Sequence, residues 1–121
     1  MLLLEPQMNR TAIGIGVTDS VVAGSNLKAP ANVVPPTLAL MFASMGTDVT
    51  ISDLGTWIGN PPPSASAYQW RLDGIDIMGE TADHYEVTGL ESIGAILTCN
   101  VTFSNSEGSA SEPSSECVII A

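Results

Sequence analysis

The stretch from Tyr68 to Gly74 places the tightest limit on what this chain can fold into. It reads Tyr-Gln-Trp-Arg-Leu-Asp-Gly, an alternating run that ends in an Asp-Gly pair. Alternation predicts a half-buried β-strand, and Asp-Gly favours a tight reversal into an antiparallel partner. The run carries one large aromatic residue, Trp70, and Cys99 follows downstream. We therefore expect this stretch to be the central strand of a small β-sandwich.

The remaining sequence repeats the same kind of signal. Short apolar or alternating segments recur about every 8–12 residues with no helical period, which is typical of an antiparallel sandwich. The 11 Gly and 8 Pro residues lie mostly between these segments. The seven expected strands cover residues 33–40, 49–57, 68–72, 75–77, 84–88, 96–103 and 117–120. We expect a stiff loop at 60–64 and a solvated Ser/Glu-rich hairpin tip at 107–116.

The charge balance limits the partners of the chain. Of its 121 residues, 45% are hydrophobic and 13% are charged, with 13 acidic against 3 basic residues and a net charge of −10. Binding to a nucleic-acid backbone needs several Lys or Arg contacts, and anionic membranes attract clusters of the same residues. We therefore expect neither nucleic acid nor a membrane as a partner.

Residues 1–30 differ from the rest, and we interpret them as an N-terminal arm that precedes a sandwich domain at 31–121. The arm is neutral overall, whereas residues 31–121 carry the entire net charge. From Thr11 to Val17, β-branched residues alternate with Ala or Gly, which predicts a strand whose bare face another backbone can approach closely. A docking arm, a strand integral to the sandwich and a disordered leader all remain open. The candidate interface residues are Thr11, Ile13, Ile15, Val17, Val21 and Val22.

No group of residues points to catalysis or to a cofactor. A nucleophilic triad needs a base beside its nucleophile, and the one histidine, His84, stands at the start of an expected edge strand. Cys99 lies on the inward face of its strand, where a cysteine behaves as a small hydrophobe. Its spacing to Cys117 matches no metal site, and both free thiols and a disulfide between the two remain open. We expect a protein that is not an enzyme.

Four acidic residues lie close together in the sequence after the Asp-Gly turn. Calcium prefers such oxygen ligands, but the mid-loop Gly and the closing Glu of an EF-hand loop are missing. We therefore expect a solvated acidic loop and no metal. The four residues are Asp73, Asp76, Glu80 and Asp83.

From Pro35 to Ile120 the sequence resembles the bacterial and phage immunoglobulin-like (Ig-like) repeats of surface and virion proteins. The pieces that carry the resemblance are Gly55-Thr56-Trp57, Gly59-Asn60-Pro61, Tyr68 to Gly74, Ile77 with Gly79-Glu80-Thr81, Tyr85, Ile93-Gly94-Ala95, Leu97 to Thr102, and Asn105 with Gly108. The resemblance implies an all-β, Ig-like antiparallel β-sandwich of about seven strands, here with an extended N-terminal arm.

Two departures from the family change the expected core. No cysteine precedes Trp70, so the inter-sheet disulfide of antibody domains is absent, and we expect Ile51 or a neighbour to fill its place. Leu97 stands where the resemblance would put a corner tyrosine. The core then depends on hydrophobic burial, with most of its bulk supplied by Trp57, Trp70, Tyr85 and Phe103.

The resemblance and the neutral arm together suggest a virion protein. The start of the chain lacks the basic region and long apolar core of a signal peptide, so we expect synthesis in the host cytoplasm and a final location in the virion. The expected role is capsid decoration in a tailed bacteriophage, with the major capsid protein or another virion protein as partner and a homo-oligomer in the particle. A tail or neck accessory protein and a carbohydrate-binding or cell-surface module are the alternatives.

Overall fold

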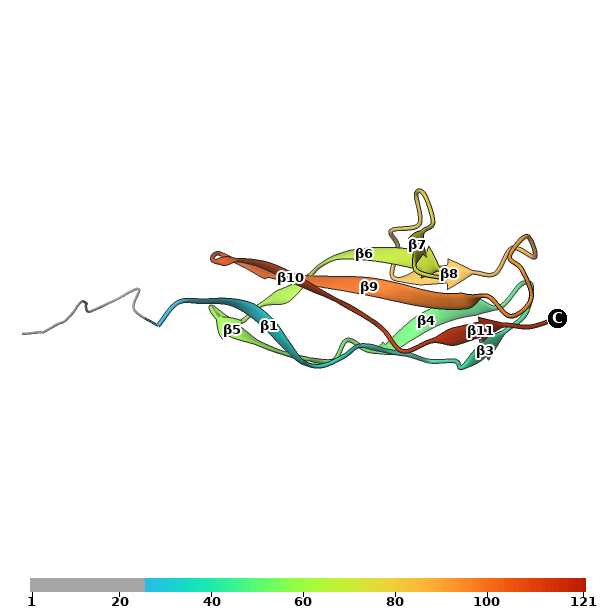
Figure 1. Cartoon of the computed structure of the whole chain (residues 1–121). Coiled ribbons are helices and arrows are strands. Elements are labelled where there is room, and N and C mark those ends of the chain that lie inside the picture. The colour runs from blue at the N-terminus through green and yellow to red at the C-terminus, as the bar shows by residue number, and fades with distance from the viewer. Residues whose placement is uncertain (1–25) are drawn as a thin grey trace, which may run out of the picture.

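The computed structural model describes residues 26–121, and this part of the chain contains strands and no helix. The predicted all-β class is therefore confirmed. The described chain is elongated, with its first residues at one pole and the C-terminus at the other (Figure 1). The strands are β1 (Lys28–Val34), β2 (Thr37–Leu38), β3 (Phe42–Ala43), β4 (Asp48–Asp53), β5 (Thr56–Asn60), β6 (Ser64–Leu72), β7 (Ile75–Asp76), β8 (His84–Glu86), β9 (Ile96–Asn105), β10 (Gly108–Pro113) and β11 (Cys117–Ile119).

Two sheets enclose the main core near the C-terminal pole. The larger sheet has the order β3-β11-β9-β6-β7, and β10 also pairs with β9. The smaller sheet has the order β2-β4-β8. β3 and β11 run parallel, and the other pairs of the described chain are antiparallel.

Trp70 stands at the centre of this core, as the sequence predicts. It pairs with Cys99 in the ladder between β6 and β9, and both residues are completely buried. The Trp70 ring lies 5.9 Å from that of Tyr85 on the opposite sheet, and its Nε1 donates a hydrogen bond to the Ala82 carbonyl. Val49, completely buried on β4, and the partly buried Ile51 supply packing in place of the missing cysteine.

The predicted Asp-Gly reversal is also confirmed. Asp73 and Gly74 both have positive φ angles, 52° and 79°, as a two-residue hairpin turn requires. The Asp73 side chain accepts a hydrogen bond from the backbone N–H of Ile96, which ties the turn to the start of β9.

A second, smaller packing unit lies at the N-terminal pole (Figure 1). Here β1 and β5 form a two-stranded antiparallel ribbon against the far ends of β9 and β10. The rings of Trp57 on β5 and Phe103 on β9 stack with centroids 4.4 Å apart and planes 9° from parallel. The ribbon is therefore joined to the main sheet by side-chain contacts rather than by a ladder.

Four sequence predictions of the strand pattern are wrong. The expected strand at 33–40 divides at Pro35 and Pro36 into the end of β1 and β2. The expected strand at 49–57 divides at Gly55, where φ is +86° and a Cβ would collide with the Val34 carbonyl. Residues 108–113, expected in a solvated tip, pair with β9 as β10. β6 begins at Ser64, inside the expected loop. The described chain has eleven strands instead of seven, because two expected strands divide and because β3 and β10 form outside the expected ranges.

Candidate functional site

The six predicted interface residues, Thr11, Ile13, Ile15, Val17, Val21 and Val22, lie outside the described residues, so their role stays a prediction. The described surface that continues from them is the N-terminal pole. β1 begins at Lys28, and the turn residue Asn26 accepts a hydrogen bond of 3.0 Å on its carbonyl from the Asn60 side chain. The chain therefore enters the domain beside the last residue of β5.

Asparagine side chains hold this pole together. Asn105 donates hydrogen bonds to the carbonyls of Lys28, at 2.7 Å, and Pro61, at 2.9 Å. Asn32 donates to the carbonyls of Val34, at 2.8 Å, and Thr56. These bonds link β1, the loop after β5 and the tip of β9, so that the ribbon has a defined place although it shares no ladder with the larger sheet.

The outer face of the ribbon is apolar and free of acidic residues. Val33 and Ile58 are 56% and 54% exposed, and Ala31, the ladder partner of Ile58, is exposed too. Lys28 is the one charged residue in the two strands. In a chain of net charge −10, such a face favours contact with an uncharged surface.

The acidic residues that follow the Asp-Gly turn do not converge. Asp76 pairs with Arg71 at 2.7 Å, and Asp73 binds a backbone N–H. Asp83 lies 3.0 Å from His84, where its hydrogen bond and the negative charge of Asp48 raise the pKa of the imidazole. Within residues 26–121, no group of three or more potential ligands is placed to hold a metal ion.

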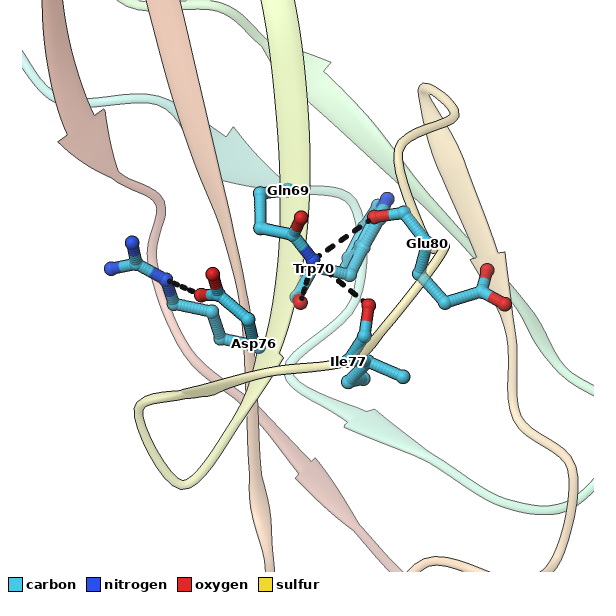
Figure 2. Close-up of polar contacts among 6 residues, drawn as sticks. Gln69, Trp70, Asp76, Ile77 and Glu80 are labelled. Carbon is cyan, nitrogen blue, oxygen red and sulfur yellow. Dashed lines mark hydrogen bonds and ion pairs between the residues drawn. The ribbon is translucent and has the colours of Figure 1, made fainter.

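The Gln69 side chain fixes the loop that carries these acids (Figure 2). Its Nε2 donates to the carbonyls of Trp70 and Ile77, both at 2.9 Å, and lies 3.4 Å from that of Glu80. The backbone adds a bond of 3.0 Å from the Trp70 N–H to the Glu80 carbonyl. The loop is held as a structural element, and Asp73, Asp76 and Asp83 are exposed to solvent around it.

Glu91 forms a polar clamp that the sequence analysis missed. Its carboxylate accepts hydrogen bonds from the Tyr85 hydroxyl, from the backbone N–H and hydroxyl of Thr88, and from the N–H of Gly89. Partial burial raises the pKa of Glu91, but the bonds from Tyr85, Thr88 and Gly89 outweigh it and lower the pKa to about 2. In the sequence, the run Thr88-Gly89-Leu90-Glu91 was the signal from which this turn could have been predicted.

The two cysteines are free and buried, so the structure contains free thiols and no disulfide between them. Cys117 pairs with Leu97 rather than with Cys99 in the ladder of β9 and β11. Burial raises the pKa of Cys99 to about 11 and also raises that of Cys117. Both thiols therefore act as core side chains rather than as nucleophiles.

Comparisons with known proteins supply no relative for this chain: no family model, no curated protein and no solved structure matches it. Over the described residues, the structure holds no helix of the length and apolarity that crossing a membrane requires. We therefore infer the function from the N-terminal pole, the placement of charge and the aromatic residues.

Proposed function

We propose that this chain is a structural virion protein of a tailed bacteriophage, in which residues 1–30 dock onto the capsid and an acidic Ig-like domain projects from it. The observation that carries the proposal is the opposition of the two poles. The chain enters at the apolar pole formed by β1 and β5, and its C-terminus lies at the far end (Figure 1). A domain held through its N-terminal segment would then point away from the particle.

The placement of charge supports this orientation. β1 and β5 hold one lysine and no acid, whereas the stretch from Asp48 to Glu91 holds eight of the thirteen acids. Acidic side chains on a projecting domain repel neighbouring copies and keep the domain soluble. A ribbon whose two strands hold a single charged residue, Lys28, costs less to desolvate against a partner than the acidic surface would.

The Ig-like assignment is part of the proposal and draws support from two features. Trp70 lies on a central strand opposite Cys99 on β9, and β3 adds in parallel to the last strand, β11. The sheets β2-β4-β8 and β3-β11-β9-β6-β7 face each other across one core. The disulfide and corner tyrosine of antibody domains are replaced by Val49 and Leu97, both completely buried.

Capsid decoration is preferred, with a tail or neck accessory as the alternative that shares the same geometry. A carbohydrate-binding module has less support, because such modules stack sugars on exposed aromatic rings. Trp70 and Tyr85 lie in the main core, and Trp57 stacks on Phe103, so that Phe42 on β3, 56% exposed, and the half-buried Tyr68 are the aromatic rings left for such a contact.

The test is whether the chain copurifies with phage particles in a fixed ratio to the major capsid protein. We expect a constant copy number that follows the symmetry of the particle, measured by quantitative mass spectrometry. A chain with Ile13, Ile15 and Val17 changed to Ser should remain in the free fraction. The control changes Met78, which is 96% exposed on a distant loop, to Ser and should still bind. Absence of the intact chain from purified particles would refute the proposal.

A further inference from the structure

At the N-terminal pole, the two packed layers have unequal numbers of strands. One layer has three strands, because β9 is flanked by β10 on one side and by β6 on the other. The layer packed against it has, among residues 26–121, only β1 and β5. β1 lies closest to β10 and also approaches β9, and β5 lies over β9. The free edge of β5 therefore faces the β6 side, where the described chain places no covering strand.

The part of β6 beneath this gap is made of small residues. Residues 64–67 read Ser-Ala-Ser-Ala; Ala65, the ladder partner of Phe103, lies on the side of the gap and is half-buried, whereas Ser64 and Ser66 lie on the opposite face with Ser104. Trp57, next to the gap, is half-buried although it stacks on Phe103. Small side chains allow another backbone to approach closely, so the gap suits a strand with a bare face.

The free edge of β5 lacks the usual protection of edge strands. Natural edges carry charged residues, proline or bulges that prevent further pairing. β5 runs Thr-Trp-Ile-Gly-Asn, with no charge and no proline inside the strand. Such an edge offers backbone donors and acceptors to an added extended segment.

We propose that residues 11–17 of the same chain fill this gap as a third strand on the edge of β5. The preceding chain emerges at the end of β5, because the Asn60 side chain binds the Asn26 carbonyl at 3.0 Å. Residues 18–26 span about 30 Å when extended. A five-residue strand is about 17 Å long, and two strand spacings measure about 10 Å, so the connection reaches either end of the edge. Tethering also gives the segment a far higher effective concentration than a second copy has in dilute solution.

The two faces of the segment fit the two sides of the gap. Ala12, Gly14 and Gly16 would face Ala65, the small residue of β6 on this side of the sheet. Ile13, Ile15 and Val17 would then extend the exposed apolar face of Val33 and Ile58. This inference goes beyond the proposed function, because it concerns the free protein and does not depend on the presence of a particle.

The direct test is cysteine cross-linking in the full-length chain. Facing residues on adjacent strands have Cβ atoms about 4.5–5.5 Å apart, close enough for many pairs to form a disulfide. Ile58→Cys is combined in turn with Cys at positions 13, 15 and 17, and in the matched controls with Cys at positions 12, 14 and 16. Cys99 and Cys117 are 0% exposed and do not compete.

We expect an intramolecular bridge for at least one of the first three combinations and for none of the controls, as seen on non-reducing gels and by peptide mapping. Bridges that join two chains would assign the gap to a second copy and overturn the proposal. Equal bridging in both sets would overturn the assignment of faces, and the absence of any bridge would overturn the contact itself.

Hydrogen exchange in the purified full-length chain gives an independent readout. The amides of residues 11–17 should exchange at least about tenfold more slowly than in an Ile15→Pro variant, since a strand protects its bonded amides. A Leu3→Pro control should leave that protection unchanged. Equal exchange in the wild type and in Ile15→Pro would contradict the proposal, and a failure to bind particles would have no bearing on it.

Discussion

The two tryptophans of this protein occupy two differently built regions. In the sandwich, Trp70 is completely buried between two sheets, and its indole N–H is paired with the Ala82 carbonyl. At the N-terminal pole, Trp57 is half-buried, with Phe103 on one side of the ring. The sandwich is closed by its own strands, whereas within residues 26–121 no strand pairs with the second edge of β5. We therefore expect the sandwich to supply most of the stability and propose that the pole makes the further contacts.

The largest expected effect comes from truncating the two tryptophans in turn. Trp70→Ala should lower the free energy of unfolding by about 3–5 kcal/mol, because it leaves a cavity in a closed core. Trp57→Ala should cost less, about 1–3 kcal/mol, because part of its ring is already in water. Denaturant unfolding of both variants measures the two values. An equal or larger loss for Trp57→Ala would remove the distinction between the regions.

The junction between the regions can be tested at glycine. Gly55 separates β4 from β5 with φ +86°, and a Cβ there would collide with the Val34 carbonyl, whereas Gly74, with φ +79°, has open space around it. Gly55→Ala should therefore cost about 2–4 kcal/mol, and Gly74→Ala only the backbone strain of about 1 kcal/mol. Thermal unfolding of both variants compares them. Similar melting temperatures of the two variants would mean that the backbone around Gly55 and Val34 shifts to accommodate a Cβ at little cost.

The Glu91 clamp should make the sandwich sensitive to acid. The pKa of Glu91 is lowered to about 2, so its contribution to stability is complete above its unfolded value and is lost as the pH falls from about 5 towards 2. Because the carboxylate is partly exposed, we expect a contribution of about 1 kcal/mol. Unfolding of wild type and Glu91→Gln across this range measures it. Parallel pH profiles of the two proteins would contradict the clamp.

The smallest effect should come from the surface ion pair of Arg71 and Asp76, which are bonded at 2.7 Å. The Asp76 side chain is exposed and that of Arg71 is partly exposed, so Asp76→Asn should cost at most about 0.5 kcal/mol and less at high salt. A double-mutant cycle with Arg71→Met isolates the pair. A coupling energy above about 1 kcal/mol would show that this ion pair contributes more to the free energy of unfolding than we expect of a surface pair.

The sequence predicted the parts of the fold that depend on local pattern. Trp70, Cys99 and the Asp73-Gly74 turn follow from alternation and from turn chemistry, both of which act over a few residues. The separate ribbon of β1 and β5 did not follow, because it depends on the approach of Val34 to Gly55 across the chain. β10 was missed because its Ser and Glu residues are strand-forming only beside β9.

The candidate site was predictable to a smaller extent. The difference between a neutral first segment and an acidic remainder is visible in the sequence, and it directed attention to the N-terminal end. That no strand of residues 26–121 covers Ala65 of β6 was not visible, since a small residue carries no signal of which layer covers it. The Glu91 clamp was missed for a related reason, because its partners meet only when β8 and the following turn are folded.

A density map of the chain bound to a phage particle would test most directly whether the protein docks through its N-terminal pole. The account predicts that the pole formed by β1 and β5 faces the particle and that the C-terminal pole, with Ala121, points away from it. A map in which the C-terminal pole contacts the particle, with β1 and β5 in open solvent, would contradict the account.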